Sequence, residues 1–124
     1  MSKALNKKEQ NGQRLRYIRV LERFSSSIVS YLFKSEEPTK EVYEKKIEAN
    51  RKYYDRCVKV PLYKEEYTKL EELVKKMINY VNSQDDIEEI KSDILYTSNQ
   101  IQKSINSRSY KKDKHANSKF NDGN

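Results

Sequence analysis

The chain contains few of the residues that make turns, disulfides and metal sites. Its 124 residues include two glycines, two prolines, one cysteine, one histidine and no tryptophan. So few glycines and prolines argue against a turn-rich β fold and favour helices. Cys57 alone excludes an internal disulfide, and together with His115 it cannot assemble a zinc site of the usual kinds. We therefore predict that the protein uses no metal and no cofactor.

The sequence also lacks a long apolar run. No segment approaches the length of a membrane span, and the N-terminus carries charges where a signal peptide would have its hydrophobic segment. Hydrophobic residues make up 35% of the chain and charged residues 36%. We expect a soluble, intracellular protein that does not contact a membrane.

A catalytic constellation is missing as well. There is no glycine-rich phosphate loop and no nucleophile beside a base at a credible spacing. Adjacent carboxylates such as Glu65-Glu66 and Asp85-Asp86 are typical of solvated helix faces, because acid/base pairs need a cleft that shifts their pKa values. We predict that the protein is not an enzyme and has no catalytic residues.

Positive charge is concentrated at the two ends of the chain. The net charge of +7 divides into +6 for residues 1–34, −2 for residues 35–107 and +3 for residues 108–124. Such a pattern is expected if the ends contact an anion such as nucleic acid. Solvated tails whose charge only keeps the protein soluble would give the same balance, so charge alone does not decide between the two.

Apolar residues recur at helical spacing along most of the chain, which predicts an all-α fold. The first helix is expected from residue 13 to about residue 33, with arginines opposite its apolar stripe. The second is expected over 40–57, because Pro38 and Thr39 suit a helix start and Pro61 cannot continue a helix. The stripe of the first helix consists of Leu15, Ile18, Leu21, Phe24, Ile28, Val29 and Leu32.

Two further helices, about 62–81 and 85–107, are predicted to form an antiparallel helical hairpin because the connection between them is short. The first has a heptad pattern, and the second begins at Asp85, which with Glu88 suits a capping box. The isoleucine stripe of the second helix is wider than one partner would cover, so we predict a homo-oligomer. The seam residues are Tyr63, Tyr67, Leu70, Val74, Met77, Ile87, Ile90, Ile94, Ile101 and Ile105.

These elements define a small bundle of antiparallel helices with one domain over residues 13–110. Residues 1–12 are expected to be a flexible basic N-terminus. Residues 111–124 have no apolar period, so we expect a flexible basic tail that is disordered until bound.

Ten tyrosines are present, and a tyrosine ring among cations is typical of single-strand nucleic-acid sites, where bases stack and phosphates are neutralised. The adjacent tyrosines Tyr53 and Tyr54 must face different sides of a helix, so one can pack while the other is exposed. Packing tyrosines beside ordinary surface cations would explain the same pattern. The two candidate places are Arg51, Lys52, Tyr53 and Arg56, and Arg108, Tyr110, Lys111 and Lys112.

The order of several short motifs resembles the UvsY recombination mediators of T4-like bacteriophages. A tyrosine pair, Tyr53-Tyr54, ends a basic helix, and an acidic turn at Asp85-Asp86 precedes the last long helix. That helix closes in Asn106-Ser107-Arg108-Ser109-Tyr110. The resemblance covers roughly residues 44–120.

The resemblance implies a non-enzymatic protein that binds single-stranded DNA as a ring-like homo-oligomer. It also implies contacts with the phage single-strand-binding protein and a RecA-like recombinase, in the cytoplasm of the bacterial host, during DNA recombination, repair and replication. We expect the six cations of the two candidate places to contact phosphates, and Tyr53 and Tyr110 to stack on bases.

Two other functions fit the same helices. A helical structural or adaptor protein of a phage or mobile element would have no nucleic-acid role. A small inhibitor of a nuclease would bind one enzyme tightly and would need no nucleic acid. The structural protein would bind no short oligonucleotide, whereas a mediator should bind an unstructured strand with an affinity that falls as salt rises. A pull-down that returns a nuclease and not a recombinase would favour the inhibitor.

Overall fold

A computed structural model describes the backbone of residues 7–121 and the side chains of residues 7–106. No strand occurs in the described part of the chain, so the predicted all-α fold is confirmed. The elements are α1 (Lys7–Lys34), α2 (Lys40–Arg56), α3 (Glu65–Asn79), a single 3₁₀ turn η1 (Tyr80–Asn82) and α4 (Ile87–Asn121).

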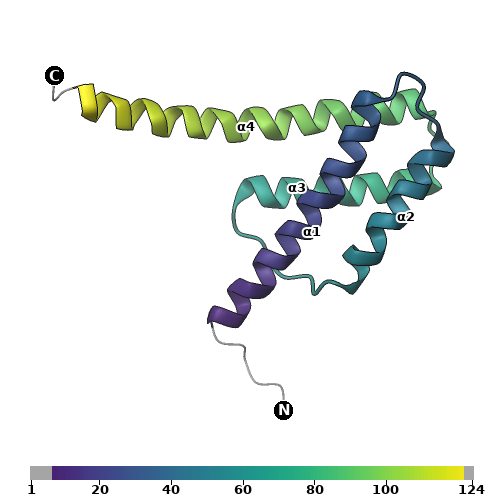
Figure 1. The fold of residues 1–124 in the computed structure, drawn as a ribbon, viewed down its shortest axis with the longest axis horizontal. Coiled ribbons are helices and arrows are strands. Elements are labelled where there is room, and N and C mark those ends of the chain that lie inside the picture. The colour runs from purple at the N-terminus through teal and green to yellow at the C-terminus, as the bar shows by residue number, and fades with distance from the viewer. Residues whose placement is uncertain (1–6, 122–124) are drawn as a thin grey trace, which may run out of the picture.

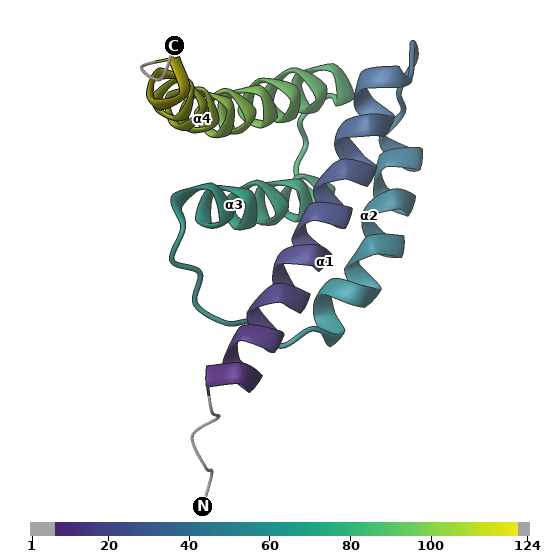
Figure 2. The same cartoon turned by 60° about the vertical axis from the view of Figure 1, so that its left-hand side comes forward.

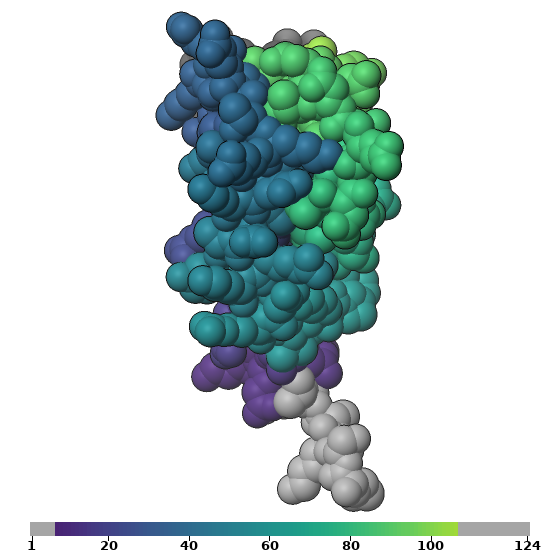
Figure 3. Space-filling view, turned by 90° about the vertical axis from the view of Figure 1, so that its right-hand side faces the viewer, coloured from purple at the N-terminus to yellow at the C-terminus, as the bar shows by residue number. Residues whose placement is uncertain are grey.

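The four helices form two layers. Helices α1 and α2 lie side by side in one layer, and α3 and α4 lie side by side in the other (Figures 1 and 2). Helix α1 crosses the second layer and contacts each of the other three helices. On the face shown in Figure 3, α2 lies beside the connection between α3 and α4. There Lys40 Nζ donates to the backbone carbonyls of Ser83 and Asp85, the latter at 3.3 Å.

The hydrophobic core lies between the two layers, and α1 contributes more of its residues than any other helix. The prediction for α1 is confirmed at Ile18, Leu21, Phe24, Ile28 and Leu32, all buried, and wrong at Leu15, which is 54% exposed. The buried residues that cluster are Tyr17, Leu21, Phe24, Ile28, Leu32, Tyr43, Ile47, Leu73, Val74, Met77, Ile90, Ile94 and Ile101.

Most of the predicted seam residues are buried or partly buried within a single chain. Five seam residues are buried there, and four more pack partly buried at the edge of the core or beside it. Tyr63 precedes α3, which begins at Glu65, and at 76% exposure it does not contribute to the core. The buried five are Val74, Met77, Ile90, Ile94 and Ile101, and the partly buried four are Tyr67, Leu70, Ile87 and Ile105.

Two helix ends differ from the prediction because local signals are weak there. Helix α1 begins at Lys7 and runs through Gly12, since a glycine inside a helix costs only about 1 kcal/mol relative to alanine. Helix α4 ends at Asn121, well past the predicted end at residue 107. Neither glycine nor proline occurs between Pro61 and Gly123, so no residue type in that stretch forces the helix to stop.

The second helix matches its prediction closely. Thr39 is its N-cap, as predicted: the Thr39 Oγ1 atom accepts from the Val42 N–H at 3.2 Å. At the other end, Lys59 Nζ donates to the carbonyl of Tyr54 and, at 3.1 Å, to that of Cys57. This satisfies carbonyls that a helix end leaves without intrahelical partners. The helix therefore ends at Arg56, before Pro61 is reached.

The start of α4 lies two residues after the predicted one. The Ile90 N–H donates to the Asp86 carbonyl at 3.0 Å, and the helix begins at Ile87. Asp86 therefore precedes the first turn, and the prediction of Asp85 as the cap is wrong. The Asp85 N–H instead donates to Ser83 Oγ at 3.3 Å, so Asp85 belongs to the turn that precedes α4.

Tyrosine hydroxyls join the helices through polar contacts. The Tyr17 hydroxyl donates to the Glu71 carboxylate, and the Tyr43 hydroxyl donates to the Met77 carbonyl at 2.6 Å. Burial raises the pKa of both hydroxyls above the ordinary value, and for Tyr17 the bond to Glu71 adds to the effect. Both tyrosines are therefore neutral hydrogen-bond donors, which burial favours over a phenolate.

Among the described residues, no helix combines the length and the apolar character needed to cross a membrane.

Candidate nucleic-acid interface

Three arginines lie together on the outer face of α1. Arg16, Arg19 and Arg23 are three and four residues apart, a spacing that places them on one side of a helix. The buried residues of the same stretch, among them Tyr17 and Leu21, hold α1 against the core. All three arginines are exposed, so their guanidinium groups are presented on one surface.

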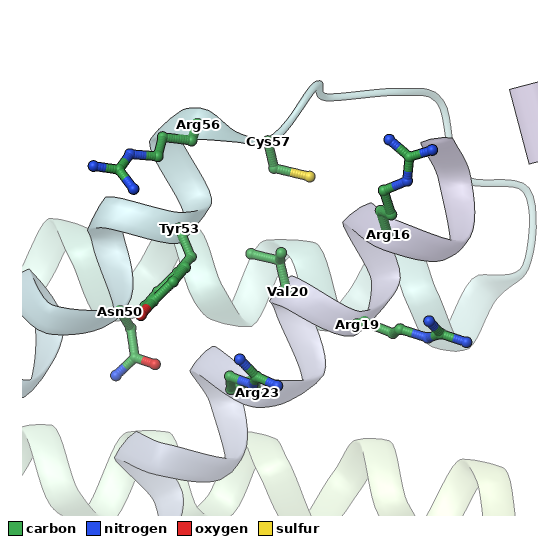
Figure 4. A pocket seen from close by; sticks show the side chains of 8 residues that line it. All are labelled: Arg16, Arg19, Val20, Arg23, Asn50, Tyr53, Arg56 and Cys57. Atoms are coloured by element: carbon green, nitrogen blue, oxygen red, sulfur yellow. The ribbon is translucent and has the colours of Figure 1, made fainter. Parts of the chain in front are cut away.

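Tyr54 fixes the rotation of α2 beside them. Its ring lies 6.0 Å from the ring of Phe24 in an edge-to-face contact and 6.4 Å from the ring of Tyr17. Tyr53 is one residue away, about 100° around the helix, and is 55% exposed. The prediction that one tyrosine packs while the other is exposed is confirmed, and the exposed one faces α1 (Figure 4).

The side chains of α1 and α2 enclose a groove of about 300 Å³. Its rim carries four guanidinium groups, and Figure 4 shows the Val20 side chain and the Tyr53 ring between them. No acidic side chain of residues 7–106 lines it. The lining residues are Arg16, Arg19, Val20, Arg23, Asn50, Tyr53, Arg56 and Cys57. We call this site the arginine–tyrosine groove.

The charge of the groove is not neutralised within the described part of the chain. None of its four arginines forms an ion pair with another described residue. Asp55, the acidic residue next to Arg56 in sequence, instead pairs with Arg51 at 3.5 Å on the exposed side of α2. Four cations around a concave surface create a positive potential that attracts anions, and guanidinium groups bind phosphate through paired hydrogen bonds.

The structure places some of the predicted site residues in the groove and others outside it. Tyr53 and Arg56 line the groove, whereas Arg51 and Lys52 are exposed on α2 and do not line it. The side chains of Arg108, Tyr110, Lys111 and Lys112 lie outside the described side chains. Their backbone belongs to the part of α4 that extends past α3 and away from α1 and α2 (Figures 1 and 2).

Sequence reasoning missed the α1 side of the groove. The arginine-rich face of the first helix was visible in the sequence, but nothing in its periodicity said that this face borders Tyr53. Asn50 also lines the groove, and its Nδ2 donates to Ser27 Oγ at 3.1 Å and to the Lys46 carbonyl at 2.8 Å. The bond to Ser27 ties α2 to α1 at one end of the groove.

The other polar clusters are weaker candidates for a binding site. No group of three or more histidine, cysteine, aspartate or glutamate side chains among the described residues could hold a metal ion. Arg14 is engaged elsewhere: its guanidinium lies 4.7 Å from the centre of the Tyr63 ring and donates to Asn11 Oδ1 at 3.0 Å. Lys59 lies 4.3 Å from the centre of the Tyr54 ring and does not line the groove.

Comparisons of the chain with protein-family models, with curated proteins and with solved structures find no match.

Proposed function

We propose that the protein is a non-enzymatic recombination mediator that binds single-stranded DNA. In this role it helps to load a RecA-like recombinase onto strands covered by single-strand-binding protein. The observation that carries the proposal is the arginine–tyrosine groove, which is lined by four arginines and the exposed ring of Tyr53 and, among the described side chains, by no carboxylate. Cations beside an aromatic ring supply the two contacts a single strand needs, namely phosphate neutralisation and base stacking.

Assembly strengthens such a site. In this proposal the antiparallel bundle forms a ring-like homo-oligomer, and each copy offers one groove to the same strand. Linking several weak sites raises the overall affinity without any new contact in one copy. The protein then holds a strand while the phage single-strand-binding protein leaves and the recombinase enters, in the cytoplasm of the bacterial host.

Strand binding is tested by removing groove charge and comparing an equal loss of charge outside the groove. The groove variant is Arg19→Ala/Arg23→Ala/Arg56→Ala. The control is Lys45→Ala/Arg51→Ala/Lys52→Ala, which removes three exposed cations from α2 that do not line the groove. Affinity for a labelled oligonucleotide, single-stranded and duplex, is measured by fluorescence anisotropy, with oligomeric state from light scattering.

The groove variant is expected to lose most single-strand binding while keeping its oligomeric state, and the control variant to keep both. The wild type is expected to prefer the single strand to the duplex. Equal losses in the two variants would show that general surface charge, and not the groove, is responsible. A wild type that binds no oligonucleotide at low salt would favour the helical structural or adaptor role.

The mediator role needs a second assay. Recombinase filament assembly is followed on a strand already covered by the phage single-strand-binding protein. The wild type should shorten the lag before assembly, and the groove variant should not. If the wild type binds the strand but leaves the lag unchanged, strand binding stands and the loading role is wrong.

A further inference from the structure

The floor of the arginine–tyrosine groove is apolar although its rim is charged. Val20, the Cys57 side chain and the Tyr53 ring lie between the arginines (Figure 4). A site for phosphate alone would need only the cations. An exposed ring at the centre of a cationic site instead matches a ligand with a flat apolar part between two anionic parts, which describes an unpaired base and its flanking phosphates.

The length of the α1 wall fits such a ligand. Arg16 and Arg23 are seven residues apart, which at 1.5 Å per residue is about 10 Å along the helix. The phosphates of one strand are separated by about 3.4 Å along a stacked helix, and by more when the strand is extended. The arginines of one copy therefore span about two or three nucleotides, with Val20 between them and facing the ring of Tyr53.

The width of the groove is held by contacts on both helices. Tyr54 packs against Tyr17 and Phe24, which fixes how far α2 is rotated. Asn50 donates to Ser27 of α1, which holds the two helices together at one end. The backbone that carries Tyr53 is therefore held in place before a base arrives, which lowers the entropic cost of binding.

From this geometry, and resting on the proposed function, we propose that each groove receives one unpaired base on the face of Tyr53. Arg16, Arg19, Arg23 and Arg56 hold the phosphates on either side of it. A duplex cannot enter in this way because its bases are paired and stacked, with no ring face free. The groove thus selects single strands by admitting a base, in addition to attracting their charge.

The base contact is tested with two ligands of equal charge, a 12-residue oligo(dT) and an abasic strand of the same length. Tyr53→Ala is expected to weaken oligo(dT) binding by about tenfold and to leave the weaker binding of the abasic strand unchanged. Tyr53→Phe keeps the ring and should bind oligo(dT) more tightly than Tyr53→Ala. The matched control is Tyr96→Ala, since Tyr96 of α4 is 64% exposed and does not line the groove; it should bind both strands as the wild type does.

Cys57 gives an independent readout because it is the only cysteine of the chain and lies in the groove. Oligo(dT) should slow the alkylation of Cys57 by a maleimide in the wild type, and Tyr53→Ala should restore much of the rate at the same oligonucleotide concentration. Circular dichroism of each variant verifies that it is folded.

If Tyr53→Ala binds oligo(dT) as tightly as the wild type and Cys57 stays reactive in the wild-type complex, the base site is wrong while strand binding stands. If the wild type binds neither strand, the proposed function fails together with the base site. An equal loss of oligo(dT) and abasic-strand binding in Tyr53→Ala also overturns the base contact, because the abasic strand has no base to stack.

Discussion

Asp93 of α4 accepts hydrogen bonds from two residues of the neighbouring segment. The hydroxyl of Tyr80 donates to it, and Lys76 lies at 3.1 Å in an ion pair. These bonds lower the pKa of Asp93 below its ordinary 3.8, and the same contact raises the pKa of Tyr80 to about 12. A carboxyl whose pKa is lower in the folded state than in the unfolded state stabilises the fold at pH values above its unfolded-state pKa. This stability is lost as pH falls through its folded-state pKa. A raised tyrosine pKa adds stability that is fully present below about pH 10 and is lost as pH rises through the folded value.

Asp93→Asn should therefore destabilise the protein in a pH-dependent way. We expect a loss of about 1 kcal/mol in the free energy of unfolding at neutral pH, because the pair with Lys76 is only partly shielded from water. The loss should be smaller at strongly acidic pH than at neutral pH, because the wild-type carboxyl also becomes protonated as pH falls through its lowered pKa. Urea unfolding followed by circular dichroism at both pH values measures it. Asp55→Asn, in an exposed pair with Arg51, should change little, and a loss for Asp93→Asn that is equal at both pH values would contradict the assignment.

Which residues of α1 are buried could be predicted only in part from the sequence. The spacing of apolar residues gave Ile18, Leu21 and Phe24 correctly. It included Leu15, which is exposed, and missed Tyr17, which is fully buried with its hydroxyl bonded to Glu71. An apolar scale favours leucine over tyrosine, whereas the long tyrosine side chain can bury its ring and still satisfy its hydroxyl. The residues that Tyr54 packs against could not be predicted, because Tyr17 and Phe24 lie on another helix.

At the scale of a helix, α2 shows how a local signal sets a boundary. Thr39→Ala should reduce the free energy of unfolding by about 1 kcal/mol, because the Val42 N–H loses its side-chain acceptor. Chemical denaturation of the purified variant measures the loss. Thr39→Ser keeps a hydroxyl at the cap and should recover most of the stability. Equal stability for the alanine variant and the wild type would mean that water satisfies this N–H as well as Thr39 does.

Helix ends with such signals were predictable and those without were not. Pro38 and Thr39 mark the start of α2, and the predicted and observed starts agree at Lys40. No proline marks the start of α1, which runs through Gly12, and no glycine or proline lies between the predicted and observed ends of α4. Propensity alone then leaves the boundary open, because helix formation there depends on small differences per residue.

The isoleucines of α4 belong to the core of a single chain before they can serve an assembly. Ile94 is fully buried between the layers, so Ile94→Asp places a charge without a partner in an apolar site. That cost is several kcal/mol, which is comparable to the total stability of a small domain. We expect loss of helical circular dichroism and not dissociation into folded subunits. Tyr96→Asp, two residues later and exposed, should stay folded; a folded monomer from Ile94→Asp would instead place Ile94 in a subunit interface.

At the scale of the whole molecule, the candidate site depends on which helices are neighbours. Tyr53 and Arg56 could be predicted from cations beside an aromatic ring in one segment. Arg16, Arg19 and Arg23 could not be joined to them, because residues on different helices meet only after the two layers have packed. Periodicity describes the faces of each helix and carries no information about which helix covers which face.

The net charge of +7 would attract a strand even without a groove, and the salt dependence of binding separates the two effects. For single strands, the logarithm of the binding constant falls with the logarithm of salt concentration by about 0.7 for each phosphate neutralised. Arg23→Ala should therefore reduce the slope by about 0.7 for each copy bound, since it removes one contact. Tyr53→Ala should lower the affinity at every salt concentration and keep the slope, because stacking releases no counterions. Arg51→Ala removes the same charge outside the groove and should change neither. Anisotropy titrations over a range of salt concentrations give the slopes of all three variants. If the slope of Arg51→Ala falls as much as that of Arg23→Ala, binding depends on net charge and not on the arginine–tyrosine groove.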